Sequence, residues 1–213
     1  MIFKPQPLQP VSRLFHYKDY LTSNKSIYWD YRTYGEQVET DLNKGCYNMD
    51  KNKLHAIHNE VLRYSAKIDP ETFKGTYIEK SIHQGRHDAV ICTENQSPKA
   101  DKVYERYLDN STEYRYFYHK NFPFVVKKTR QKGDFSMGFE SAELWKFTDK
   151  QNEQIKLFCE AYGIDFAELD VIIYRKKIYI IDVNNMAGNG LFFQKFKDGE
   201  ACEKLYIKQL QNL

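Results

Sequence analysis

Apolar residues recur at helical spacing in the segment that begins near residue 50. Leu54, Ile57, Val61 and Leu62 fall on one face of a helix, and Asp50 ahead of them is a good N-cap residue. This pattern predicts a helix of roughly 13 residues.

Three further segments carry helix signals. Thr148 and Gln151 form a capping-box sequence ahead of a run of apolar residues at helical spacing, and Gly163 supplies the C-terminal stop. We also expect a short helix over Ser12–Leu21 and a last helix from Asp198 to near Leu210.

Extended segments lie between these helices. A polar loop joins the run Thr76–Ile82 to Ala89–Thr93, which predicts a hairpin with a long loop. Lys102–Leu108 reads as a further strand. Two more extended runs, Tyr114–His119 and Phe122–Arg130, flank a tight turn.

The chain of 213 residues is long enough for one domain of two lobes with a substantial core. The polar stretch ahead of residue 102 reads as a link, so we expect an N-terminal lobe over residues 1–101 and a C-terminal lobe over residues 102–213. Strands and helices in both lobes predict an α+β fold. The stretch between residues 22 and 49 has no clean periodicity, so its elements are not predicted.

Charge and cysteine content narrow the function classes. With 32 basic and 29 acidic residues the net charge is +3, which gives no support to a general nucleic-acid or membrane-surface role. The four cysteines include no CxxC pair, which disfavours a zinc site and a disulfide framework. The N-terminus has no apolar run of signal-peptide length, and no stretch reaches the length of a membrane span, so we expect a cytoplasmic protein.

Near the C-terminus, alternation predicts a hairpin of two strands, Phe166–Tyr174 and Ile178–Asn184, joined by a three-residue loop. A loop of that length pairs position 170 with 182 and position 168 with 184. Four oxygen-bearing side chains then share one face: Glu168, Asp170, Asp182 and Asn184. The opposite face is wholly apolar and carries Leu169, Val171, Ile173, Tyr179, Ile181 and Val183.

This acidic face predicts a cation site. Carboxylates directly opposite each other have Cβ atoms roughly 4.5 to 5.5 Å apart, which costs stability unless a cation or a shared proton separates them. Oxygen ligands on a rigid scaffold suit Mg²⁺, which keeps waters and recruits substrate phosphates. The alternative is an ordinary solvated face whose carboxylates never meet, because a change of one residue in loop length would break the pairing.

Basic residues suggest where an anion could bind. Lys80 shares a strand face with Ile78, so its ammonium group projects from a partly apolar strand, although a lysine on an edge strand is usually solvated. The following loop, Ser81–Asp88, supplies a hydroxyl, a glycine and a cation that could fold over phosphates. A second group on the next two strands is either an exposed cationic ribbon or a pocket for phosphates and an acidic acceptor: Arg115, Lys127, Lys128 and Arg130.

The order of these motifs resembles the ATP-grasp superfamily. A strand lysine, a loop, the segment Val103–Asp109 and basic strands precede Glu168–Val171 and Ile181–Asn185, and the resemblance covers roughly Asn48 to Asn189. It implies two α+β lobes that grip ATP between antiparallel sheets, with the nucleotide in the cleft and Mg²⁺ bridging its phosphates.

The resemblance also implies roles for individual residues in binding ATP. Lys80 is similar to the lysine that contacts the α and β phosphates, and Ser81 and Gly85 belong to the lid loop. Glu105 and Leu108 match the linker positions that meet adenine, and Asp109 lies near the ribose position. Asp170, Asp182 and Asn184 resemble the metal ligands, with Glu168 in support.

Arg115 resembles the arginine that faces the phosphates or the acceptor, and we place Arg130 beside it as a second catalytic cation. The chain departs from the family in two respects. Its lid loop has one glycine where many relatives have several, and it lacks room for the separate N-terminal domain with which many ATP-grasp ligases bind substrate.

The implied function is an ATP- and Mg²⁺-dependent ligase that forms a carbon–nitrogen bond through an acyl phosphate. Its partners would be a small-molecule carboxylate and an amine, and the sequence leaves a protein partner or a homo-oligomer open. The alternatives are an ATP-dependent kinase acting on a small molecule and a nucleotide-binding module without catalysis.

Overall fold

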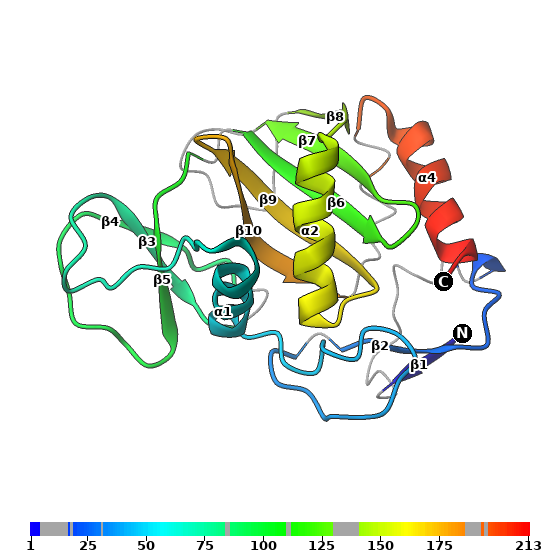
Figure 1. Cartoon of the computed structure of the whole chain (residues 1–213), viewed down its shortest axis with the longest axis horizontal. Coiled ribbons are helices and arrows are strands. Elements are labelled where there is room, and N and C mark those ends of the chain that lie inside the picture. Colours follow the sequence, from blue (N-terminus) through cyan, green and yellow to red (C-terminus); the bar gives the residue numbers. More distant parts are fainter. Residues whose placement is uncertain are drawn as a thin grey trace.

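The computed structural model describes residues 1–4, 17, 19–30, 32–83, 86–109, 112–129, 141–185, 193 and 196–213. Within this part of the chain, helices and strands are mixed as expected for an α+β protein (Figure 1). The helices are α1 (Lys51–Leu62), α2 (Asp149–Tyr162) and α4 (Gly199–Gln211). The strands are β1 (Ile2–Lys4), β2 (Ser26–Tyr28), β3 (Tyr77–Ser81), β4 (Val90–Cys92), β5 (Lys102–Arg106), β6 (Thr112–His119), β7 (Phe124–Thr129), β8 (Ser141–Trp145), β9 (Phe166–Tyr174) and β10 (Lys177–Asn184).

Two antiparallel sheets dominate the fold. The larger has the strand order β10-β9-β6-β7-β8 and the smaller has the order β4-β3-β5, while β1 and β2 form a separate parallel pair. The hairpin predicted from the sequence is confirmed, because β3 and β4 pair antiparallel. In Figure 1 the small sheet lies to one side of the large one, with α1 near their junction.

The position of β5 differs from our expectation. We assigned Lys102–Leu108 to the start of the second lobe, but β5 pairs antiparallel with β3 along its whole length, from Lys102 opposite Ser81 to Arg106 opposite Tyr77. β3 therefore lies between β4 and β5 in the small sheet. The limits 1–101 and 102–213 for the two lobes therefore stay a prediction.

The helix signals are confirmed at three places. The side chain of Asp50 caps α1 by accepting a hydrogen bond from the Asn52 N–H, and Thr148 and Gln151 form both halves of the capping box of α2. Gly163 ends α2 in the left-handed region at φ 79°. The last helix, α4, also lies where expected, whereas most of the expected helix over Ser12–Leu21 lies outside the described residues.

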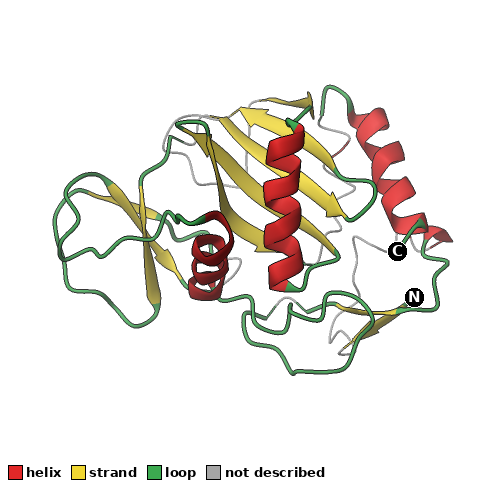
Figure 2. Ribbon diagram, in the orientation of Figure 1, coloured by secondary structure: helices red, strands yellow, loops and turns green. Residues whose placement is uncertain are grey.

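In Figure 2, α2 crosses one face of the large sheet and α4 lies beside the sheet. Side chains of α1 and α2, such as Leu54 and Phe158, share a core with Leu169 and Val171 of β9. The other face of the sheet packs against α4, where Tyr206 joins a second core. Among the described residues, no helix combines the length and apolar character that crossing a membrane requires.

The unpredicted stretch before α1 is fixed to the end of α2 by close backbone contacts. The buried side chain of Asn43 accepts hydrogen bonds from the Asp165 and Phe166 N–H groups and donates to the Phe166 carbonyl. Gly45 donates to the Gly163 carbonyl, and a Cβ atom at Gly45 would lie 1.7 Å from the Tyr162 carbonyl oxygen. These contacts hold the start of β9, and so help to position the acidic hairpin.

Candidate nucleotide and metal site

The register of the acidic hairpin agrees with the prediction, although the turn does not. Asp182 lies opposite Asp170, and Asn184 lies opposite Glu168. The loop has two residues rather than three, because Tyr174 pairs directly with Lys177 across a turn in which Arg175 and Lys176 have φ angles of 49° and 64°.

An irregularity between Ile180 and Asp182 restores the predicted pairs. A two-residue turn alone would leave each acidic residue one position out of register, and the extra residue, Ile181, compensates for the shorter loop. We had predicted that Tyr179, Ile181 and Val183 share one apolar face of the hairpin, and this prediction was wrong for part of β10. Ile178, Ile180 and Val183 all pack into the core with α1 and α2, whereas Tyr179 and Ile181 lie in a separate cluster with Leu108.

Asp170 lies at the centre of a network of opposite charges. Arg115 on β6 donates from Nε to Asp170 Oδ1 at 3.0 Å and from its NH2 nitrogen to Oδ2 at 3.2 Å. A further donor on Arg115 lies 3.2 Å from Glu168 Oε2. Lys128 on β7 contacts Asp170 Oδ1 at 3.2 Å and also binds the buried carboxylate of Glu113.

The network keeps Asp170 ionised. Although burial alone would raise the pKa of Asp170, the neighbouring Arg115 and Lys128 hold that pKa far below its usual range. The same carboxylates raise the pKa of Arg115. Five charged side chains from three neighbouring strands, two cations and three carboxylates, thus pair with one another while Asp170 remains an anion that can bind a cation.

Asp182 has a different environment on the neighbouring strand. Its Oδ1 atom is buried and has no hydrogen-bond partner in the described part of the chain, and the nearest cation, Lys51 Nζ, lies 3.9 Å away. A buried carboxylate oxygen without a donor is unfavourable and fits a cation ligand. Within the described ranges, no cluster of three or more His, Cys, Asp or Glu side chains is arranged to hold a metal, so a site here would combine Asp170 and Asp182 with the amide of Asn184.

Lys51 is a site residue that our sequence analysis missed. It occupies the first position of α1, its side chain is buried, and its Nζ atom donates to the His83 carbonyl at 2.7 Å. Burial is the main cause that lowers its pKa, and Asp182 opposes this effect. The only signal in the sequence was its place directly after the N-cap Asp50, where the start of the helix meets the loop after β3.

Lys80 joins the two sheets. Its Nζ atom lies 2.7 Å from Glu105 Oε1 on β5 and donates to the Ile181 carbonyl on β10 at 3.0 Å. The predicted phosphate lysine therefore lies against the strand that carries Asp182. Its ammonium group and that of Lys51 approach this strand from the small sheet and from α1, respectively.

Glu105 is buried and bound on two sides. Its Oε1 atom contacts Lys80 and also lies 2.7 Å from His55 Nε2. These cations and donors outweigh burial and lower the pKa of Glu105 to about 2. Because an ionised carboxylate only accepts, His55 Nε2 carries the hydrogen, and in the neutral ring Nδ1 accepts from the Ser65 hydroxyl at 2.9 Å. That Glu105 meets adenine stays a prediction; in the structure its carboxylate contacts Lys80 and His55.

The remaining predicted nucleotide contacts lie around the same junction. Leu108 is buried in a small apolar cluster with Ile172 and Tyr179, and Asp109 follows it at an exposed position. Ser81 is buried at the end of β3. Two predicted residues, Gly85 and Arg130, lie outside the described residues.

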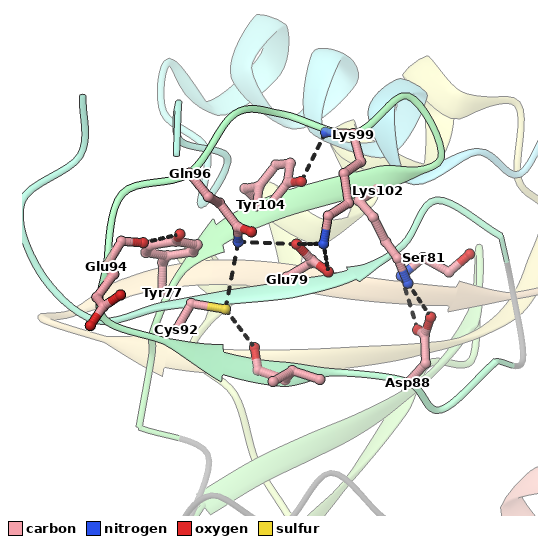
Figure 3. A network of polar contacts seen from close by, with 11 residues as sticks. Tyr77, Glu79, Ser81, Asp88, Cys92, Glu94, Gln96, Lys99, Lys102 and Tyr104 are labelled. Carbon is pink, nitrogen blue, oxygen red and sulfur yellow. Dashed lines mark hydrogen bonds and ion pairs between the residues drawn. The ribbon is translucent and has the colours of Figure 1, made fainter. Parts of the chain in front are cut away.

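Polar contacts on the other face of β3 fix the strand that carries Lys80 (Figure 3). Glu79 accepts hydrogen bonds from Lys99 at 2.9 and 3.0 Å and from Gln96 at 3.0 Å. At the end of the loop Ser81–Asp88, the Asp88 carboxylate accepts from the Ser81 N–H at 2.9 Å and from Lys102 at 2.6 Å. These contacts tie both ends of that loop to the small sheet.

Two antiparallel sheets that meet at Lys51, Lys80 and a paired set of carboxylates define a two-lobed α+β protein with a charged junction. The chain has the ATP-grasp fold, as comparison with solved structures shows. It matches the D-alanine–D-alanine ligase of Bacillus anthracis complexed with ATP, at 15% identity and a TM-score of 0.56, over 96% of this chain and 84% of that one. It also matches the D-Ala:D-Ser ligase VanG of Enterococcus faecalis, at 12% identity and a TM-score of 0.55, over 78% of this chain and 61% of that one.

A third match is the ATP-grasp ligase PsnB complexed with a minimal precursor, at 15% identity and a TM-score of 0.55. It covers 76% of this chain and 61% of PsnB, so the chain spans about three fifths of the length of that relative. No protein-family model and no curated protein sequence matches the chain.

Proposed function

We propose that the protein is an ATP- and Mg²⁺-dependent ligase that joins a carboxylate to an amine. The observation that carries this proposal is the contact between Lys80 and the Ile181 carbonyl, because it brings a predicted phosphate lysine to the strand that presents Asp182. The structural neighbours PsnB, VanG and the D-alanine–D-alanine ligase are all ligases, which supports the reaction class.

In the proposed reaction, a carboxylate oxygen of the acceptor attacks the γ-phosphorus of ATP, and ADP leaves. The amine then attacks the carbonyl carbon of the acyl phosphate, and inorganic phosphate leaves as the amide forms. The chain contributes positioning and charge neutralisation rather than a covalent nucleophile. Lys80 and Lys51 bind phosphate oxygens, and Arg115 stabilises negative charge on the transferred group or the acceptor.

Asp170, Asp182 and Asn184 would hold Mg²⁺, which supplies charge neutralisation at the phosphates. Arg115 and Lys128 keep Asp170 ionised and oriented for this role. Leu108 and the apolar residues around it would receive the adenine, with Asp109 near the ribose. Ser81, Gly85 and Arg130 complete the proposed phosphate and acceptor contacts.

The acceptors are proposed to be a small-molecule carboxylate and an amine. Among the structural neighbours, VanG is a D-Ala:D-Ser ligase, and PsnB is a ligase that forms a complex with a precursor peptide. We also propose a cytoplasmic location, because all four cysteines are free thiols.

The reaction can be tested with acceptor carboxylates labelled with ¹⁸O, paired with a panel of amines and ATP. A ligase that forms an acyl phosphate transfers one ¹⁸O atom from the carboxylate to inorganic phosphate and leaves the other ¹⁸O atom in the amide carbonyl. A kinase instead leaves a stable phosphorylated product. ATP binding without ADP release from any pair would contradict both and indicate a module without catalysis, and Asp182→Asn serves as the inactive control.

A further inference from the structure

A pocket of about 530 Å³ lies on the face of α1 that the proposed nucleotide site does not use. One wall is a stripe of α1 that includes Asn52, His55 and Asn59, which follow one another at helical spacing. The other walls come from the segment after α1, from the end of β5 and from the start of β10. The pocket therefore lies between the small sheet and the large one, but Lys80 and Lys51 do not line it.

Three cations from three different segments line the pocket. Lys67 follows α1, Arg106 ends β5, and Lys177 begins β10. No aspartate or glutamate is among the lining residues, and no ion pair joins any of the three to a carboxylate within the described part of the chain. By contrast, the cations of the proposed nucleotide site, Lys51, Lys80, Arg115 and Lys128, each have an acidic partner.

Neutral neighbours hold these cations in place. Lys67 Nζ donates to Asn52 Oδ1 at 2.7 Å, and Lys177 Nζ lies 4.6 Å from the centre of the Tyr64 ring. The guanidinium carbon of Arg106 lies 5.8 Å from the centre of the Phe73 ring. Contacts of this kind restrict a cation without neutralising its charge, so the pocket keeps a positive potential that an anion would lower.

We propose that this pocket binds a small organic anion with two or more carboxylate or phosphate groups. Its volume suits a small molecule, and an arginine with two lysines can meet two anionic groups at once. Asn52, Asn59 and the Ser65 hydroxyl supply neutral polar groups that can bind the rest of the ligand. This site uses none of the residues assigned to the phosphates or to Mg²⁺, while Tyr64 and Tyr179 also pack in the apolar cluster around Leu108.

His55 offers a direct reporter of binding. Its ring lines the pocket, while Nδ1 and Nε2 lie within hydrogen-bonding distance of Ser65 and Glu105. An anion in the pocket changes the field at this ring, so the proton resonances of the His55 ring should shift on titration.

The test is calorimetric titration with pyrophosphate and with citrate, with acetate as the monovalent control, together with NMR of the His55 ring. Four proteins are compared: wild type, Arg106→Gln/Lys177→Gln, the matched surface control Lys120→Gln/Lys150→Gln, and Lys80→Gln. All four positions of the two double variants are exposed, so these variants should fold as wild type does.

We expect pyrophosphate or citrate to bind wild type, the surface control and Lys80→Gln with similar affinity and to shift the His55 resonances. Arg106→Gln/Lys177→Gln should bind at least about tenfold more weakly, because two charge-assisted contacts are lost. Tighter binding of pyrophosphate would assign phosphate ligands, and tighter binding of citrate would assign carboxylates. Absence of binding to wild type, equal binding to Arg106→Gln/Lys177→Gln, or loss confined to Lys80→Gln would overturn the proposal.

Discussion

The buried ion pair at Glu105 gives a quantitative prediction about stability and pH. The carboxylate is only 3% exposed and contacts both Lys80 and His55, and the pKa of Glu105 falls from 4.5 to about 2 on folding. At about 1.4 kcal/mol for each pH unit, this difference corresponds to about 3 kcal/mol of stability at neutral pH.

The sign follows from the depressed pKa. Glu105 stabilises the fold fully above pH 4.5, where the unfolded chain is also ionised, and the contribution falls as the pH drops toward 2. By pH 3 about 2 kcal/mol of it should be lost, because the unfolded chain is protonated and the folded chain is not.

The perturbation is Glu105→Gln, measured by urea unfolding at pH 7 and at pH 3. At pH 7 the variant should be about 3 kcal/mol less stable than wild type, because Lys80 and His55 lose their anionic partner. At pH 3 the difference should shrink to about 1 kcal/mol. Glu153→Gln, which removes an exposed partner of Lys156, is the control and should change stability by less than about 1 kcal/mol at either pH. A difference between wild type and Glu105→Gln that is the same at both pH values would refute the reasoning.

Two further substitutions test the packing and the charge network. Gly45→Ala places a Cβ atom 1.7 Å from the Tyr162 carbonyl oxygen and should lower the free energy of unfolding in urea by about 3 kcal/mol. Thr148→Ala removes the N-cap of α2 and should lower it by only about 1 kcal/mol. A smaller loss for Gly45→Ala than for Thr148→Ala would contradict the close contact at Gly45. Asp170→Asn leaves Arg115 without its bidentate partner and should lower the free energy of unfolding by about 3 to 5 kcal/mol, and an unchanged stability would show that the network contributes nothing.

The sequence predicted the acidic hairpin well because its signals are local. Alternation of side chains and the oxygen-rich face identified the pairs of Asp170 with Asp182 and of Glu168 with Asn184, which the structure confirms. The predicted length of the turn was wrong because its two residues at positive φ are Arg175 and Lys176, and neither is the glycine or asparagine that usually marks such a turn. The irregularity at Ile181 could not be predicted from the alternation of side chains, because the shorter turn and the extra residue cancel and leave the predicted pairs unchanged.

Other features depend on contacts between distant segments, and the sequence carries little trace of them. Nothing near Lys102–Leu108 indicates that β5 joins β3 rather than the following strands. Lys51 gains its place only because α1 meets both His83 and Asp182, which are far along the chain. Likewise, the partnership of Glu105 with His55 depends on how α1 packs against the small sheet.

The central claim is that this chain binds ATP with Mg²⁺ at the junction of its two sheets. The most direct test is calorimetric titration of ATP with and without Mg²⁺ on wild type, on Asp182→Asn, and on Asp101→Asn as an exposed control. We predict Mg²⁺-dependent binding to wild type and to Asp101→Asn, weakened at least about tenfold in Asp182→Asn. Equal binding by all three proteins, or no binding by wild type, would contradict the account.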